Sequence, residues 1–238
     1  MNPIGVVICN YNKKDFVLQC VQSVLESKEK NFDIYVVDNA SSDGSAEALK
    51  KAYGNRITVI ENKENLGGSG GFNTGLRIVR DKGYSYFMCL DDDAAVDENA
   101  LSVLYHYMEE HTDTGMAGCR VYHTQMSDYI QQSGLLIDFD NCTAKTIGAD
   151  MPEDGSLPDV IECDTVATCA VMVRADTVKQ KGVGIMPEDN FIYWDDMEWG
   201  YRIKLAGYRV VTLAEAKALH QMGANTKKEN TFINYYMW

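Results

Sequence analysis

Apolar positions in the first ninety residues alternate between two periods. Short β-branched runs of strand length are separated by longer segments in which apolar residues recur every three or four positions. This alternation predicts strands over 4–9, 33–38, 57–61 and 84–90 and helices over 13–29, 44–53 and 73–83. Strands that alternate with helices at this spacing indicate an α/β fold with a mostly parallel sheet and helices on both faces.

The second half of the chain is less regular. Its periodicity predicts helices over 98–111 and 195–207 and strands over 115–122, 165–174 and 208–213. Between 123 and 160, Gly, Asp, Asn and Pro interrupt short apolar pieces, which predicts loops and short antiparallel strands. The segment 230–238 is amphipathic and predicts a last helical stretch at which the chain is cut short.

Composition and charge narrow the class of protein. The 238 residues fit one large domain or two small ones, and a formal net charge of -13 argues against a nucleic-acid partner. Seven cysteines without a CxxC pair indicate a reduced, cytosolic chain without structural zinc. No run of about 18 apolar residues is present, and no basic region precedes the first apolar run, so neither a membrane span nor a signal peptide is expected.

Three adjacent aspartates follow the buried strand over 84–90. Carboxylates this close repel one another, and burial disfavours their ionised forms. One acidic residue would suffice to start the helix over 98–111, and three exceed that need. The pair Asp91 and Asp93 therefore indicates a divalent cation that bridges a diphosphate. From these residues alone the capping and metal interpretations both stay open.

Two further segments lie at predicted strand ends. The glycine-rich stretch over 65–75 is neither a dinucleotide fingerprint, since Asn73 stands where a small residue is needed, nor a P-loop. Its place between a strand and a helix favours a loop that contacts a sugar or phosphate over a flexible linker. Asp38 could accept hydrogen bonds from a nucleobase or a ribose, although from these residues alone helix capping by Ser42 or Asp43 is the favoured explanation of that segment.

The segment 191–211 combines carboxylates with aromatic residues. Asp195 and Asp196 begin a predicted helix, where the helix dipole alone could explain them. The aromatic residues around them are Phe191, Tyr193, Trp194 and Trp199. Aromatic walls beside carboxylates bind sugars and raise a carboxylate pKa toward use as a general base. His220 is either a structural histidine or a third ligand for the cation at the aspartates.

Taken in order, these segments resemble the inverting family 2 glycosyltransferases of GT-A fold. The segments that carry the resemblance are NYNKKDFVLQCVQSVL (10–25), VVDNASSDGS (36–45), NLGGSGGFNTG (65–75), LDDDA (90–94), TCAVMVRAD (168–176) and YWDDMEWGYRIKLAGYRV (193–210), followed by His220. They cover almost the whole chain. The segment WDDMEWG (194–200) is most similar to the corresponding segment of bacterial galactofuranosyltransferases. Many rhamnosyltransferases have a Glu-Asp pair in place of Asp195 and Asp196.

The resemblance implies a direct displacement on a nucleotide sugar, with UDP as the expected nucleotide and Mn²⁺ or Mg²⁺ as the cofactor. Asp196 would be the catalytic base, and Asp91, Asp93 and His220 would hold the metal. The residues implied in donor binding are Asn10, Tyr11, Asn12 and Asp38 for the nucleoside, Gly67, Gly68, Gly71 and Asn73 for the sugar, and also Asn65 and Asp92. Trp194, Asp195 and Trp199 would bind the acceptor.

The resemblance also implies an organisation and a cellular role. We expect a single GT-A domain over 1–238, with a nucleotide-binding half (1–97) and an acceptor-binding half (98–238) that carries a small antiparallel sheet. The acceptor would be a glycan or lipid-linked glycan in cell-surface polysaccharide synthesis. The protein would be cytoplasmic, at the inner face of the membrane, attached peripherally through further C-terminal residues, and homo-oligomeric.

Three other functions remain as alternatives. A sugar-nucleotide nucleotidyltransferase would usually have a glycine-rich phosphate loop after its first strand, and NYNKKD is not such a loop. A non-catalytic nucleotide- or glycan-binding relative would not need both the metal acids and Asp196. A metal-dependent phosphatase would use Asp91 as its nucleophile.

Overall fold

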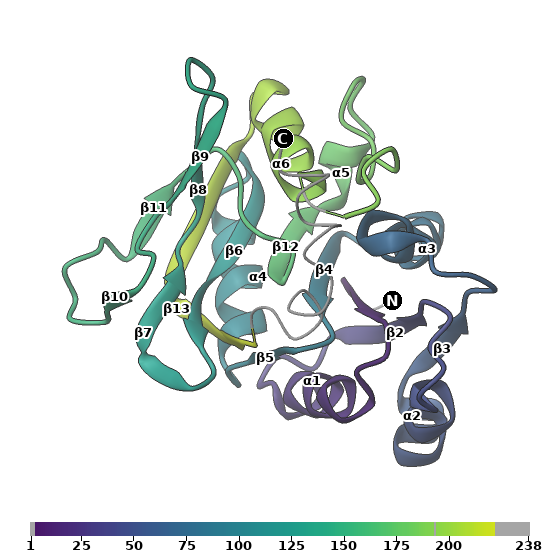
Figure 1. Ribbon diagram of the computed structural model, residues 1–238. Coiled ribbons are helices and arrows are strands. Elements are labelled where there is room, and N and C mark those ends of the chain that lie inside the picture. Colours follow the sequence, from purple (N-terminus) through teal and green to yellow (C-terminus); the bar gives the residue numbers. More distant parts are fainter. Residues whose placement is uncertain (1–2, 193, 222–238) are drawn as a thin grey trace.

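The computed structural model describes residues 3–192 and 194–221, in which eleven strands form one mixed sheet (Figure 1). The parallel part consists of β1 (Ile4–Asn10), β2 (Phe32–Asp38), β3 (Thr58–Glu61) and β4 (Tyr86–Asp91). β1 lies between β2 and β4, and β3 forms the edge beside β2. The parallel sheet expected from the alternating pattern is confirmed.

Helices cover both faces of this sheet because successive strand residues point to opposite sides. Val6 and Ile8 of β1 pack in the same apolar cluster as α1 (Lys14–Glu26), α2 (Ser45–Tyr53) and α4 (Ala100–Glu110). Val7 lies in the opposite cluster with α3 (Gly67–Lys82) and α6 (Asp195–Leu205). The strands therefore read as continuous apolar runs, as expected for a sheet that is buried on both faces.

The second half extends the sheet with antiparallel and mixed pairings. β12 (Ala170–Arg174) lies antiparallel between β4 and β6 (Thr114–His123). The long strand β13 (Arg209–His220) runs parallel to β6 and antiparallel to β5 (Ala94–Val96), which directly follows the three aspartates. This pairing brings the end of β13 back to the carboxyl end of β4.

The middle of the chain forms the short antiparallel strands expected there. They are β7 (Met126–Gln132), β8 (Leu135–Asp138), β9 (Thr143–Thr146), β10 (Met151–Pro152) and β11 (Val160–Glu162). β8 and β9 form a separate two-stranded antiparallel sheet, while β7 pairs with β6 and β10 at the edge of the main sheet. The remaining short elements are the 3-10 turn η1 (Gly54–Arg56) and α5 (Ala175–Val178).

Some predicted boundaries were wrong. The strand expected over 208–213 continues to His220, because its residues alternate between buried and exposed and pair with strands on both sides. The strand expected over 165–174 begins only at Ala170, and β5 was not predicted. The helical stretch expected over 230–238 lies outside the described residues. Within the described part of the chain, no helix is both long and apolar enough for a membrane span.

The glycine-rich segment is helical, although it was expected to be a loop. α3 begins at Gly67, six residues before the predicted start, and its glycines allow close packing. A Cβ on Gly71 would lie 2.4 Å from the Cys9 sulfur, whereas a Cβ on Gly68 would meet only Asp195 Oδ2, at 3.7 Å. Gly71 is therefore required where α3 rests on β1.

We expect Gly71→Ala to destabilise the fold by about 1–3 kcal/mol, because the added methyl overlaps Cys9 in a closely packed core. Gly68→Ala, the same change in the same helix, should alter the free energy of unfolding by no more than about 1 kcal/mol. Urea unfolding of both variants measures the difference. Equal stabilities would contradict the assigned packing role of Gly71.

Candidate active site

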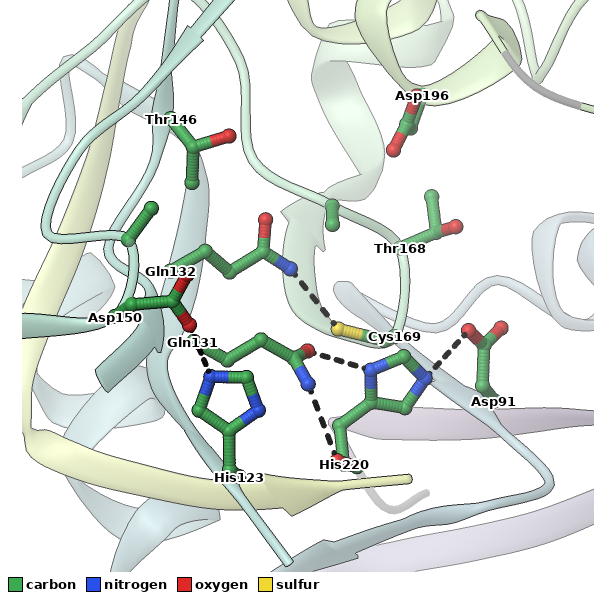
Figure 2. A pocket seen from close by; sticks show the side chains of 12 residues that line it. Asp91, His123, Gln131, Gln132, Thr146, Asp150, Thr168, Cys169, Asp196 and His220 are labelled. Carbon is green, nitrogen blue, oxygen red and sulfur yellow. Dashed lines mark hydrogen bonds and ion pairs between the residues drawn. The ribbon is translucent and has the colours of Figure 1, made fainter. Parts of the chain in front are cut away.

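The ends of β4 and β13 and the first turn of α6 surround one cavity of about 270 Å³. Figure 2 shows Asp91 and His220 at one part of the cavity wall and Asp196 at another, with Gln131 beside His220 and with Gln132 and Thr146 across the cavity from Asp91. The cavity lies at the carboxyl ends of the parallel strands, where ligands bind in open α/β sheets.

Three candidate metal ligands meet at one side of the cavity. His220 Nε2 lies 3.6 Å from Asp91 Oδ2 and 3.2 Å from Asp93 Oδ1, and the three ligand atoms lie within 4.8 Å of one another. His220 reaches the aspartates because its strand residue pairs with Ala94. Two carboxylate oxygens and one imidazole nitrogen fit the preferences of Mn²⁺, and the carboxylates also fit Mg²⁺. The residues predicted to hold a metal are thus brought together.

The capping interpretation of the aspartates does not agree with the structure. The helix over 100–110 is preceded by Asp97, whose carboxylate accepts a hydrogen bond from the backbone N–H of Asn99 at 2.9 Å. Asp92 and Asp93 instead contact Lys13, whose ammonium lies 3.0 Å from Asp92 Oδ1 and 2.6 Å from Asp93 Oδ2. Their mutual repulsion is offset by a lysine from the start of α1.

Asp92 was expected to bind the donor, and this expectation was wrong. Its side chain is buried, and its second oxygen, Oδ2, accepts a hydrogen bond from the backbone N–H of Tyr11 at 3.0 Å. Burial raises the pKa of Asp92 to about 7 even beside the Lys13 ammonium. Sequence reasoning missed Lys13, although a lysine at the start of a helix opposes the helix dipole and so favours a nearby acidic partner.

Gln131 of β7 holds His220 in a fixed orientation. Its side-chain oxygen lies 2.7 Å from His220 Nδ1, and its amide nitrogen donates to the His220 carbonyl at 3.2 Å. The Nδ1 contact leaves Nε2 directed toward the aspartates, as Figure 2 shows for Asp91. Burial would lower the pKa of His220, but the hydrogen bond to Asp93 and the charge of Asp91 outweigh burial and raise it. The sequence held no periodic or motif signal for Gln131.

The pKa values of the cluster aspartates diverge. Burial raises the pKa of Asp91. Burial acts in the same direction on Asp93, but the hydrogen bond from His220 and the charge of Lys13 outweigh it, so the pKa of Asp93 falls below its usual value. Of the two predicted carboxylate ligands, Asp93 is therefore more readily ionised than Asp91.

Asp196 also lines the cavity, at a different part of its wall from Asp91 and His220. It follows Asp195 in the first turn of α6, and its backbone carbonyl accepts a hydrogen bond from the Thr165 hydroxyl at 2.7 Å. Burial raises the pKa of Asp195 to about 6. Burial, together with the negative charge of Asp195, raises the pKa of Asp196 to about 7. A carboxylate with this pKa is well suited to take up a proton near neutral pH.

The two tryptophans expected at the acceptor lie in different environments. Trp194 precedes α6 in the left-handed conformation, at φ 66°, with 39% of its surface exposed. Trp199 is fully buried in the core, and its indole N–H donates to the Gly184 carbonyl at 3.0 Å. The prediction that Trp199 binds the acceptor was therefore wrong, because its side chain packs α6 onto the apolar core.

The residues predicted to bind the nucleoside are adjacent at the ends of β1 and β2. Asn10 donates to Asp38 at 2.8 Å and to the Ser41 hydroxyl at 3.1 Å, and both Asn10 and Asp38 are buried. Asn10 Oδ1 is buried without a hydrogen-bond partner among the described atoms. Tyr11 and Asn12 are exposed, and Asn12 accepts from the Ser42 backbone at 2.8 Å. At this edge of the sheet, Asn10 and Asp38 are thus buried, whereas Tyr11 and Asn12 are exposed to solvent.

The residues predicted near the donor sugar differ in exposure, since Asn65 and Gly68 are partly exposed and the other three are buried. Gly68 borders Asp195, and Asn65 accepts hydrogen bonds from Asn39 at 2.8 Å and from the Gly67 backbone at 2.9 Å.

Gly67, Gly71 and Asn73 are buried, and direct sugar contact by them was wrongly expected. Gly67 packs against the Phe191 backbone and Gly71 against Cys9. Asn73 donates to the Met186 carbonyl and to Glu188 Oε1, both at 2.9 Å, so it anchors the segment before α6.

Comparison with known families and sequences gives a consistent result. Residues 5–172 match the family described as "Glycosyl transferase family 2". A teichoic acid poly(glycerol phosphate) polymerase of Staphylococcus epidermidis is 26% identical over 59% of this chain and 19% of its own length. The Escherichia coli UDP-Glc:alpha-D-GlcNAc-diphosphoundecaprenol beta-1,3-glucosyltransferase WfaP is 30% identical over 46% of this chain and 42% of its own length. The chain thus spans less than half the length of these relatives.

Solved structures share the fold over nearly the whole chain. A mannosyltransferase, PcManGT from Pyrobaculum calidifontis, in complex with GDP-Man and Mn²⁺, superposes with a TM-score of 0.68 at 16% identity, over 94% of this chain and 58% of that one. GalNAc-T7 with UDP, GalNAc and Mn²⁺ gives a TM-score of 0.72 at 14% identity, over 92% and 43%. These similarities confirm the GT-A fold.

We expect Gln131→Leu to weaken the apparent affinity for Mn²⁺, measured calorimetrically at saturating UDP, by about tenfold or more, because His220 loses the group that orients it. Gln132→Leu is the matched control, since Gln132 lines the same cavity but contacts the Cys169 sulfur. Equal Mn²⁺ affinities for the two variants would contradict the orienting role.

Proposed function

The chain belongs to glycosyl transferase family 2, and we propose that it transfers a hexosyl group from a UDP-sugar to a hydroxyl of a glycan or lipid-linked glycan, with inversion. The observation that carries this proposal is that Asp91 and His220, which lie together with Asp93, line one part of a cavity and Asp196 lines another. A cation site and a base of raised pKa that share one cavity are what displacement at a diphosphate sugar requires.

The donor would lie along the carboxyl ends of β1, β2 and β4. Tyr11 and Asn12 would contact the nucleoside at the edge framed by Asn10 and Asp38. Asp91, Asp93 and His220 would hold Mn²⁺ or Mg²⁺, which when bound supplies positive charge against the diphosphate. Asn65 and Gly68 would border the sugar, next to Asp195.

The acceptor would enter the cavity from the side of β7 and β9. Gln132 and Thr146 line this side, and Thr168 lines the cavity nearer Asp91 and Asp196; all three offer hydrogen bonds that suit a polyhydroxylated acceptor. Trp194 and Asp195, at the start of α6, would contact the acceptor near the reacting hydroxyl.

The transfer itself is a single displacement. Asp196 takes the proton of the acceptor hydroxyl as its oxygen bonds to the anomeric carbon. On the opposite face of the sugar, the bond between the anomeric carbon and the diphosphate oxygen breaks, and its electron pair leaves with UDP. The anomeric configuration is therefore inverted.

The cellular role is proposed from the relatives. The teichoic acid polymerase and the diphosphoundecaprenol-linked glucosyltransferase support a role in cell-surface polysaccharide synthesis with a lipid-linked acceptor, and a place at the inner face of the membrane stays a prediction. The finer similarity of WDDMEWG to galactofuranosyl- and rhamnosyltransferases stays a prediction, as do homo-oligomerisation and peripheral membrane attachment. Family membership favours glycosyl transfer over the nucleotidyltransferase and phosphatase alternatives.

The proposed donor class is tested by thermal unfolding with UDP, GDP and their sugar derivatives, each with and without Mn²⁺. We expect UDP to raise the melting temperature only when Mn²⁺ is present, because binding to the native state stabilises it. Asp93→Ala should abolish this shift. No stabilisation by any nucleotide would favour a non-catalytic glycan-binding relative.

We expect Asp196→Asn to retain UDP binding and to lower the rate of transfer by about 10²–10⁴-fold, because the amide cannot take up the proton. Asp176→Asn, at an exposed site whose carboxylate pairs with Lys179 among the described residues, should leave the rate unchanged. Turnover of a UDP-sugar is the measurement, and a rate close to that of the unmodified protein would exclude Asp196 as the base.

The same assignment predicts a pH dependence. Since the pKa of Asp196 is raised to about 7, the base is mostly protonated below this pH and mostly ionised above it. The rate should rise about tenfold between pH 6 and pH 8. A rate that is flat over this range, or that falls with pH, would contradict general-base action by Asp196.

A further inference from the structure

Lys13 is a positive charge built into the acidic cluster. It lies at the start of α1, and its side chain is only 13% exposed. Its ammonium lies within hydrogen-bond distance of two carboxylates, Asp92 and Asp93, which are themselves almost completely buried. A buried ammonium between two buried carboxylates is held much more firmly than a surface ion pair.

The position of Lys13 is unfavourable except for these two contacts. A cation at the N-terminus of a helix opposes the positive end of the helix dipole. The neighbouring Lys14 is directed elsewhere, since its ammonium lies 3.4 Å from the Asp43 carbonyl and its backbone N–H donates to the Asp43 carboxylate. The two adjacent lysines thus differ in whether they face the acidic cluster.

Lys13 shares Asp93 with the candidate metal ligands without occupying their side. It contacts Oδ2 of Asp93, whereas Oδ1 of the same carboxylate lies 3.2 Å from His220 Nε2. A cation bound by Asp91, Asp93 and His220 would therefore have the Lys13 ammonium on the far side of one of its own ligands. Like charges this close repel in a partly buried site, which weakens binding of a cation that arrives alone.

We propose that Lys13 is a built-in counter-ion that keeps the affinity of the empty site for a free divalent cation low, so that the cation is taken up together with the donor diphosphate. The diphosphate contributes negative charge that offsets both the cation and Lys13. Lys13 acts through Asp92 and Asp93 and is a positioning residue. The joint uptake of cation and donor diphosphate rests on the proposed function, whereas the effect of Lys13 on binding of the free cation does not.

The test is a calorimetric titration of Mn²⁺ alone into the unmodified protein, Lys13→Met and Lys14→Met. We expect Lys13→Met to bind Mn²⁺ at least about tenfold more tightly, because the opposing charge is removed, and Lys14→Met to behave as the unmodified protein. An unchanged or weaker Mn²⁺ affinity in folded Lys13→Met would overturn the proposal.

Two further variants separate charge from folding. Asp92→Asn removes a negative charge without touching a candidate ligand, so it should weaken Mn²⁺ binding, and it tests the proposal even if Lys13→Met does not fold. The double variant Lys13→Met/Asp92→Asn removes one charge of each sign and should return close to the original affinity. Unaltered Mn²⁺ binding by Asp92→Asn, or a double variant that binds as tightly as Lys13→Met, would argue against the proposal.

A parallel titration with UDP at saturating Mn²⁺ distinguishes this proposal from the proposed function. If no variant binds UDP, the unmodified protein included, the proposed function fails while the Mn²⁺ comparison still decides the role of Lys13. If Lys13→Met loses UDP binding without any gain in Mn²⁺ affinity, Lys13 is a diphosphate ligand and the counter-ion proposal is overturned.

Discussion

The repulsion among three adjacent carboxylates at the end of a buried strand is the constraint on which the rest of the site depends. Without neighbouring cations, burial and mutual repulsion would favour the protonated forms of these carboxyl groups. The fold supplies those neighbours from opposite ends of the described chain, Lys13 at the start of α1 and His220 at the end of β13. The strand order and the length of β13 are thus tied to the chemistry of the cluster.

The two ends of the cavity differ in electrostatic character. At the metal cluster, hydrogen bonds and positive charges hold Asp93 ionised. At the start of α6, burial beside Asp195 raises the pKa of Asp196. The same residue type is therefore held as an anion beside Lys13 and His220, and is brought closer to neutrality where burial and Asp195 dominate its surroundings, as the proposed base requires.

The sequence predicted the parallel half of the fold because strand and helix periods are local properties. It also predicted that Asp91, Asp93 and His220 meet. It misjudged Trp199, Asn73 and Gly71, which are buried supports rather than contacts for a ligand, since the kind of residue does not reveal the direction of its side chain. Lys13 and Gln131 were missed because their partners are distant in sequence and become neighbours only through sheet pairing.

Gln131 belongs to two sites at once. It lines the cavity proposed for the acceptor, and it holds the imidazole that faces the aspartates. Any acceptor that shifts this amide also changes the orientation of His220 and hence the free energy of cation binding. Thermodynamic reciprocity then requires the cation to alter acceptor affinity by the same factor. One side-chain amide thus makes the two halves of the cavity a linked system, in which neither ligand binds independently of the other.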